Sequence, residues 1–173
     1  MRATPLMIVL AVSLQPTFAD EALKEYASEV GRFKVLLPGT PEVQKMTQKA
    51  PDGSDVEMTV FRCPKVGGNT VIIATSEFAE SYLKNSTEEI LDNARDGSIG
   101  RSKGKLVSEK KIKWGDHPGP EFVVGLPKER SFIRARAYMV GKRQFSILIV
   151  GNDEKAIATK EVEALVDSFK FAK

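Results

Sequence analysis

The sequence has few of the side chains that enzymes use for chemistry. Its 173 residues include one cysteine, one histidine and one tryptophan. A single cysteine, Cys63, excludes an intramolecular disulfide whatever the redox state of the compartment. A serine or cysteine nucleophile needs a base within hydrogen-bond reach, and His117 is the one imidazole that could serve. We therefore expect a protein that is not an enzyme, with a hydrolase as the less favoured alternative.

The histidine lies in a segment rich in glycine and proline. The stretch WGDHPGPEF, residues 114–122, contains Asp116, His117 and Glu121, all of which are residue types that can ligate a metal. A structural zinc site, however, needs four ligands that converge on one point, and the sequence holds no second histidine. Glycine permits positive φ and proline fixes φ, so the composition suits a corner between strands. We interpret 114–122 as a structural turn and expect neither a metal nor another cofactor.

The first 19 residues have the layout of a secretory signal peptide. Arg2 precedes a short apolar run, and small residues lead up to Ala19. The run is shorter than the roughly 20 apolar residues needed to span a bilayer. We predict a cleaved leader at residues 1–19, a single domain at residues 20–173, export to the periplasm or the exterior, and no transmembrane segment in the mature chain. The alternative is an N-terminal helix that stays in the fold.

The charges are nearly balanced overall but unevenly distributed. Removing residues 1–19 from the 26 lysines and arginines takes away only Arg2, which leaves 25 basic side chains against 23 acidic ones. This balance argues against a dedicated nucleic-acid-binding protein. Residues 101–113 are locally basic, either to contact an anionic partner or to protect an edge strand from aggregation. The candidate contact residues are Arg101, Lys103, Lys105, Lys110, Lys111 and Lys113, together with Arg134 and Arg136 from a later strand.

Alternation of apolar and polar residues predicts most of the chain to be β-structure. Residues 33–37 begin what we interpret as an antiparallel meander, with a hairpin at Asp52-Gly53. The run 70–78 is apolar on both faces, which is typical of a central strand. Arg134 and Arg136 share a face of their strand and either pair with carboxylates beneath a helix or line a shallow groove. The further predicted strands are 42–50, 56–63, 105–114, 121–126, 131–140 and 144–151.

Two segments have helical signals. Ser86 and Glu89 form a capping box, and Gly97 offers a left-handed stop for the helix that follows. Near the C-terminus apolar residues recur at helical spacing. We therefore predict an α+β fold, in which one inserted helix and one C-terminal helix pack on a mostly antiparallel sheet. The C-terminal apolar positions are Ala158, Val162, Leu165, Val166 and Phe169.

Two stretches resemble a known superfamily. GRFKVLLPGTPE (31–42) and RAYMVGKRQFSILIVGNDEKAIATKEVEALVDSFKF (136–171) are similar in strand order and apolar positions to the PsbP-like and DcrB-like superfamily of small exported proteins. The resemblance implies an α/β sandwich that binds other proteins or assists assemblies, without catalysis of its own. No functional residue of PsbP matches a position here, so its role at a metal cluster is not transferred.

These observations leave two main functional hypotheses. The first is a non-enzymatic exported protein that binds a protein partner or an envelope component. The alternative is a small-ligand or metal-binding module that uses the sheet face around Arg134 and Arg136.

Overall fold

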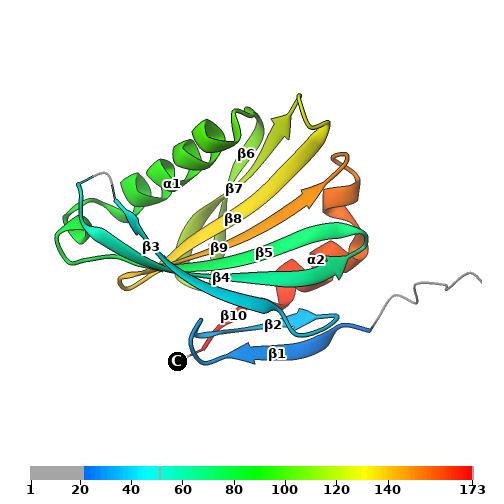
Figure 1. Cartoon of the computed structure of the whole chain (residues 1–173), viewed down its shortest axis with the longest axis horizontal. Coiled ribbons are helices and arrows are strands. Elements are labelled where there is room, and N and C mark those ends of the chain that lie inside the picture. Colours follow the sequence, from blue (N-terminus) through cyan, green and yellow to red (C-terminus); the bar gives the residue numbers. More distant parts are fainter. Residues whose placement is uncertain (1–21, 51, 173) are drawn as a thin grey trace, which may run out of the picture.

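The structure, a computed structural model, describes residues 22–50 and 52–172, so the predicted leader lies outside the described residues. Within them, seven strands form one antiparallel sheet in the order β3-β4-β5-β9-β8-β7-β6 (Figure 1). The predicted central strand 70–78 is confirmed, because β5 lies between β4 and β9. The strands are β3 (Glu42–Lys49), β4 (Asp55–Val66), β5 (Asn69–Glu77), β6 (Lys105–Trp114), β7 (His117–Leu126), β8 (Ser131–Val140) and β9 (Arg143–Gly151).

Turns with glycine at positive φ join neighbouring strands of this sheet. Gly53 has φ +83° in the β3–β4 hairpin, so the predicted hairpin at Asp52-Gly53 is confirmed, and Gly141 has φ +59° in the hairpin between β8 and β9. The β6–β7 turn consists of Gly115, with φ +56°, and Asp116. The interpretation of all of 114–122 as a corner is therefore wrong in extent. Residues from His117 onward pair with β6, because an extended backbone accommodates proline at a sheet position that needs no donor.

A second, smaller sheet contains β1 (Lys24–Ser28), β2 (Phe33–Leu37) and β10 (Lys170–Phe171), in the order β1-β2-β10. The predicted meander from β2 into β3 is therefore wrong. Three alternate residues of β2 are fully buried, whereas every residue of β3 is exposed. The apolar face of β2 is buried by stacking on the large sheet as a second layer, and pairing with β3 at its edge would not provide that cover.

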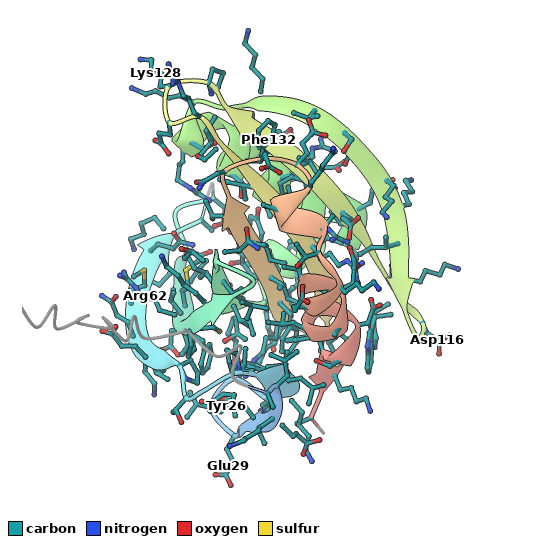
Figure 2. The ribbon with its side chains drawn as sticks, turned by 90° about the vertical axis from the view of Figure 1, so that its right-hand side faces the viewer. Tyr26, Glu29, Arg62, Asp116, Lys128 and Phe132 are labelled. Carbon is teal, nitrogen blue, oxygen red and sulfur yellow. The ribbon has the colours of Figure 1, made fainter. Side chains whose placement is uncertain are left out.

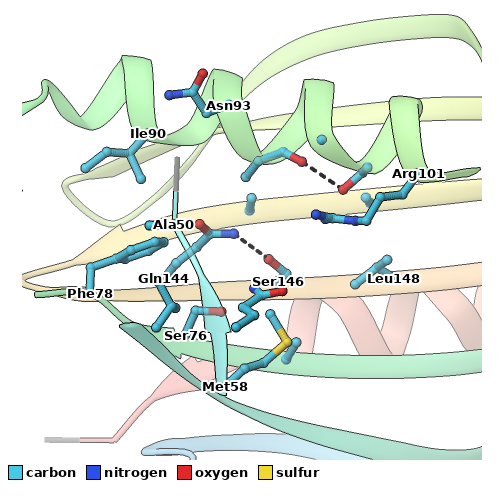
Figure 3. Close-up of a pocket in the computed structure, with 18 of the residues that line it drawn as sticks. Ala50, Met58, Ser76, Phe78, Ile90, Asn93, Arg101, Gln144, Ser146 and Leu148 are labelled. Atoms are coloured by element: carbon cyan, nitrogen blue, oxygen red, sulfur yellow. Dashed lines mark hydrogen bonds between the residues drawn. The ribbon is translucent and has the colours of Figure 1, made fainter. Parts of the chain in front are cut away.

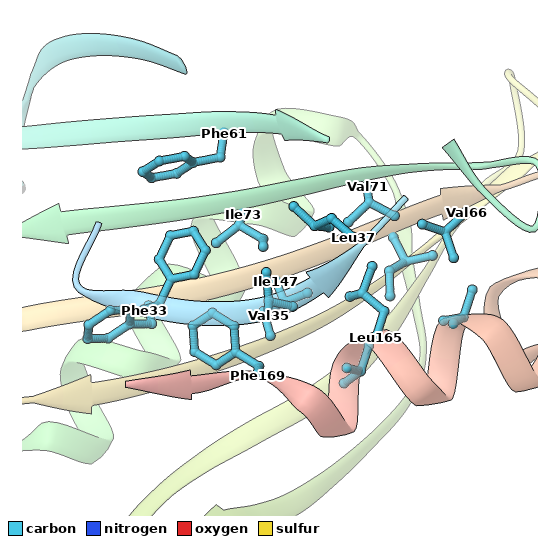
Figure 4. Close-up of a cluster of buried hydrophobic side chains, with 14 of the residues drawn as sticks. Phe33, Val35, Leu37, Phe61, Val66, Val71, Ile73, Ile147, Leu165 and Phe169 are labelled. Atoms are coloured by element: carbon cyan, nitrogen blue, oxygen red, sulfur yellow. The ribbon is translucent and has the colours of Figure 1, made fainter. Parts of the chain in front are cut away.

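One face of the large sheet is covered by the small sheet and by α2 (Lys160–Ser168) (Figure 1). Figure 4 shows Phe33 of β2 and Phe169 beside α2 pointing at the large sheet. The Phe33 ring lies 4.9 Å from that of Phe61 and 5.3 Å from that of Phe169. The predicted C-terminal amphipathic helix is confirmed. Its apolar positions Val162, Leu165, Val166 and Phe169 are all buried, but the predicted position Ala158 is exposed and precedes the helix, and Ile157 is the buried residue there.

The opposite face is covered by α1 (Thr87–Ser102) (Figure 1). The predicted N-cap is confirmed, since Ser86 Oγ accepts a hydrogen bond of 3.2 Å from the Glu89 amide. The predicted stop at Gly97 is wrong, because α1 continues to Ser102 and ends at Lys103, which has φ +51°. Interior glycine costs a helix only about 1 kcal/mol, which capping and packing outweigh. Among the described residues, no helix is both long and apolar enough to cross a bilayer.

The Phe33 ring is expected to be a main stabilising element of the two-sheet core. Replacing Phe33 by alanine leaves a cavity between two other phenylalanine rings and should lower the free energy of unfolding by about 3–5 kcal/mol. Val43→Ala on β3 is the control, because Val43 is 46% exposed and its loss creates no cavity. Urea unfolding monitored by circular dichroism measures both. Equal, small losses would contradict the assignment of the core.

Candidate ligand-binding site

The lone histidine lies in an aromatic cluster. The His117 ring is 6.3 Å from the Trp114 ring and 5.6 Å from the Phe171 ring. Asp116 projects from the tip of the β6–β7 hairpin (Figure 2), and Glu121 is buried further along β7. The structure therefore does not bring the three side chains of 114–122 together. In residues 22–50 and 52–172, no three His, Cys, Asp or Glu side chains are grouped so that they could hold a metal ion.

The Cys63 thiol is also unsuited to chemistry. It packs against the core between the two sheets. Burial raises its pKa from 9.0 to about 12, so the protonated thiol dominates at neutral pH. A protonated thiol is a poor nucleophile and a poor metal ligand.

Arg134 and Arg136 pair with carboxylates beneath α2, which was one of the two arrangements that the sequence left open. Arg134 Nη2 is 2.8 Å from Glu121 Oε2, and the same carboxylate accepts from Arg136. From α2, Glu163 pairs with Arg134, and Asp167 lies 3.4 Å from Arg136 Nη1. The sheet face around the two arginines is thus occupied by the protein's own carboxylates. It fastens α2 to β7 and β8.

The Glu121 carboxylate is the centre of this ionic cluster. It is 6% exposed, and a third cation, Lys110 of β6, reaches it at 2.8 Å. Burial raises the pKa of Glu121, but hydrogen bonds from Lys110, Arg136 and Arg134 lower it more, and the pKa falls from 4.5 to about 2. The carboxylate therefore stays charged throughout the neutral range and compensates the buried guanidinium of Arg134.

The basic residues of 101–113 do not form one surface. Lys110 pairs with Glu121 on the α2 side of the sheet, and Lys111 pairs with Glu88 of α1 at 2.8 Å. Successive side chains of a strand point to opposite faces of the sheet, so Lys110 and Lys111 lie on different faces. Arg101 lies on α1, away from both. Within the described parts of the chain, four members have no salt bridge: Arg101, Lys103, Lys105 and Lys113.

A cavity of about 510 Å³ lies between α1 and the large sheet (Figure 3). Ion pairs from Glu88 and Arg95 join the helix to the edge strand β6, and the apolar side chains of the helix contact the sheet at two separate points. Near its start, Ile90 and Leu91 pack on β8. Near its end, Ile99 packs against a cluster centred on β7. The space between these contacts is lined mainly by the strand residues Met58, Val60, Ile72, Ala74, Ser76, Phe122, Ala135, Ala137, Gln144, Ser146 and Leu148.

Small side chains on both walls keep this space open. On α1 the residues that line the cavity include Ala94, Gly97 and Ser98, where a fully amphipathic helix would carry large apolar residues. On the opposing sheet face, Ala74 of β5 and Ser146 of β9 are paired directly across the strands. The side chains of α1 and those of the sheet therefore do not meet in this region, and the sheet surface between the Ile90 contact and the Ile99 contact stays uncovered.

A sequence signal for the cavity exists, but it was misinterpreted. The apolar and small residues Ile90, Ala94, Gly97 and Ser98 follow the helical spacing of one face, and Arg101 continues it by one turn. A helix that stops at Gly97, as the sequence predicted, lacks Ser98 and Arg101 and therefore does not show the whole face. The sheet wall of the cavity was not detectable in this way, because it is built mainly from β4, β5, β7, β8 and β9, which are spread over the whole sequence.

Polar side chains lie among the apolar ones in the lining, and some of them pair with each other. Gln144 Nε2 donates to Ser146 Oγ at 2.9 Å, and Asn93 Nδ2 donates to Tyr82 Oη at 3.5 Å. The described residues that line the cavity include no aspartate or glutamate. Arg101 approaches from the last turn of the helix (Figure 3). The site therefore combines apolar side chains with uncharged polar groups and a positive charge at one end, which suits binding, and its described lining offers no acid–base pair.

The fold has a counterpart among solved structures. The solution structure of cyanobacterial PsbP (CyanoP) from Synechocystis sp. PCC 6803 is similar with a TM-score of 0.57, covering 97% of this chain and 99% of that chain at 12% sequence identity. The chain has a PsbP-like fold. The predicted resemblance and the predicted α+β class are thereby confirmed, while the likeness at this identity extends to the fold alone. No model of a protein family matches the sequence, and no curated protein does either.

We expect the ionisation of Glu121 to make the free energy of unfolding fall at low pH. Glu121→Gln removes the buried negative charge that Arg134 and Arg136 share, leaving only Glu163 and Asp167 of α2 to pair with them, and should lower the free energy of unfolding at pH 7 by about 3 kcal/mol. In the wild type, the depressed pKa makes this contribution full above pH 4.5 and progressively lost as the pH falls towards 2. The variant should lack that part of the pH dependence.

Urea unfolding at several pH values between 2 and 7 measures the effect. Glu88→Gln is the matched control, since Glu88 pairs with Lys111 at the exposed surface and its loss should change stability little. Similar pH profiles for the wild type and Glu121→Gln would refute the proposed role of Glu121.

Proposed function

We propose that the protein is an exported, non-enzymatic binding protein that holds a small, largely apolar ligand between α1 and the large sheet. The cavity of about 510 Å³ carries this proposal. Ligand sites in proteins fall between roughly 300 and 1,000 Å³ and are mostly apolar with a few placed polar groups. The leader pattern of residues 1–19 supports export. The location of His117 and the high pKa of Cys63 support a function without catalysis.

The composition of the walls supports a ligand over a packing defect. Filling the space would need only larger apolar residues at Ala94, Gly97 or Ala74, and filled cavities stabilise proteins. Instead, the sheet presents Met58, Ile72 and other apolar side chains to an open space. Apolar surface left facing water forgoes about 25 cal/mol per Å². A ligand that covers this surface recovers that free energy on binding.

The proposed site lies on the opposite sheet face from the one expected from the sequence. The small-ligand alternative placed the ligand around Arg134 and Arg136, whose guanidinium groups are engaged by Glu121, Glu163 and Asp167. The face towards α1 carries no such cluster among the described residues and retains open volume. We therefore propose the ligand there.

Filling the cavity from the sheet side should abolish binding. Ala74→Leu puts a larger side chain in the middle of the lining and should weaken binding of the neutral fluorophore N-phenyl-1-naphthylamine at least tenfold, because both need the same volume. It should also raise the melting temperature. Fluorescence titration and thermal unfolding measure the two effects.

Thr70→Leu is the matched control for this experiment. Thr70 lies on the same strand and the same face as Ala74, but it is exposed and does not line the cavity. The control should bind the fluorophore as the wild type does. Equal binding by wild type and Ala74→Leu, or no binding by either, would overturn the proposed function.

Binding of a protein partner is a second candidate function, and the exposed side chains of the edge strand β6 support it. Leu106 and Val107 are 45% and 46% exposed at an irregularity in the β6–β7 register, next to Lys105. An exposed apolar pair on an unpaired strand edge, rimmed by a cation, suits an acidic protein partner. The hypothesis from the sequence that the protein binds a partner has its best support here.

The partner surface is tested by comparing the two sheet edges. Leu106→Asp with Val107→Asp should remove a protein that cross-links to the wild type in envelope extracts. Val43→Asp with Met46→Asp, on the opposite edge strand β3, should leave that cross-link unchanged, since both pairs are similarly exposed. A cross-linking pattern that is the same for all three proteins would exclude β6 as the partner surface.

A further inference from the structure

One basic side chain that lines the cavity has no carboxylate partner among the described residues. The basic residues among its lining are Lys49, Arg101 and Arg136. Lys49 pairs with Asp55 at 2.8 Å, and Arg136 is held by Glu121 on the other face of the sheet. No described residue forms a salt bridge with Arg101, and the described lining contains no acidic residue. A ligand that enters the cavity therefore meets a net positive charge supplied by Arg101.

The Arg101 side chain is directed at the cavity by the shape of α1. Side chains of a helix lean towards its N-terminus, which carries the guanidinium back over Gly97. A Cβ atom at position 97 would lie 3.5 Å from Arg101 Nη1, so a larger residue there would take the space that the guanidinium uses. Figure 3 shows Arg101 reaching between α1 and the sheet in the direction of Ser146. A basic residue in the last turn is also favoured by the helix dipole, but that effect does not require the Arg101 side chain to point into the cavity.

The other end of the cavity is mainly aromatic and aliphatic, with the Gln144 amide beside it. Figure 3 places Phe78 and Ile90 at the end opposite Arg101. The rings of Phe78 and Tyr82 are stacked there with centroids 4.9 Å apart. Ile90 and Arg101 are separated by roughly 16 Å along the helix axis, from a rise of 1.5 Å per residue. The site is thus elongated, with one mainly apolar end and one cationic end.

We propose that the ligand is a fatty acid, which binds with its carboxylate at Arg101 and its acyl chain towards Phe78 and Ile90. This inference rests on the proposed function of the same cavity. A guanidinium presents paired N–H groups that match the two oxygens of one carboxylate. Arg101 is itself exposed, so the head group lies at the solvent side while the chain covers the apolar walls.

The alternatives in ligand charge fit this arrangement less well. A cationic amphiphile would place its head group beside Arg101, with no acidic residue in the described lining to compensate it. A neutral amphiphile would gain the apolar contacts but no charge-assisted hydrogen bond. A phosphate head group carries up to two negative charges, whereas the end of the cavity offers a single unpaired cation.

Three probes with the same chain length separate head-group recognition from chain burial. Laurate, dodecan-1-ol and dodecyltrimethylammonium are each titrated, below their micelle concentrations, against the purified protein loaded with N-phenyl-1-naphthylamine. We expect laurate to displace the fluorophore with an affinity about 10- to 100-fold higher than dodecan-1-ol. Dodecyltrimethylammonium should be the weakest. Equal affinities for laurate and dodecan-1-ol would overturn the proposal.

Arg101→Gln provides the residue-level test. It should lower laurate affinity by the same 10- to 100-fold and leave dodecan-1-ol affinity unchanged, since the apolar walls are intact. Lys105→Gln is the matched control: it removes the same charge four residues away, on β6 and outside the lining, and should change neither affinity. Thermal unfolding of both variants checks that each is folded.

The outcomes distinguish this inference from the proposed function. If dodecan-1-ol and laurate bind equally and Ala74→Leu still blocks both, the cavity is a ligand site and the assignment of a carboxylate to Arg101 is wrong. If none of the probes binds, the proposed function is wrong and the fatty-acid assignment with it. If Arg101→Gln and Lys105→Gln weaken laurate equally, the effect reflects net charge and the assignment to Arg101 is likewise wrong.

Discussion

The whole structure depends on one constraint, which is that the central strands carry apolar side chains on both faces. In β5 and β9, Val71, Ile73, Ile147 and Ile149 point to one face, while Ile72 and Leu148 point to the other. Both faces must therefore be covered, and a single layer cannot do this. The two layers that cover the large sheet differ in how closely they pack. A three-stranded sheet and α2 cover one face closely, whereas α1 is the main cover of the other face and packs its apolar side chains on it at two places.

The buried ionic cluster explains how the closely packed face accommodates charge. Arg134 and Arg136 lie on a face that is otherwise apolar, and leaving them unpaired there would cost several kcal/mol each. Glu121 is placed directly opposite Arg136 by the β7–β8 register, and α2 adds Glu163 from above. A shift of β7 by one residue would turn Glu121 to the other face. The cluster therefore couples the pairing of two strands to the docking position of the last helix.

Much of the fold could be predicted from local patterns. The central position of β5, the N-cap at Ser86 and the apolar stripe of α2 each depend on residues close together in sequence, and each is confirmed. The errors have a common cause. The pairing of β2 with β10 in place of β3, and the continuation of α1 through Gly97, were decided by packing against distant segments. Local propensity contains no information about such contacts.

The sequence by itself determined the limits of the chemistry and the α+β class. One imidazole and one thiol restrict what the chain can catalyse, and alternation with two helical stripes defines the elements, because both are properties of residue type and spacing. Only the tertiary structure decided where a ligand can bind. A cavity is the volume that side chains from α1 and several strands leave unfilled, and the same fold directs Arg101 into it while it covers Arg134 and Arg136. That volume depends on how distant segments meet, which no local pattern records.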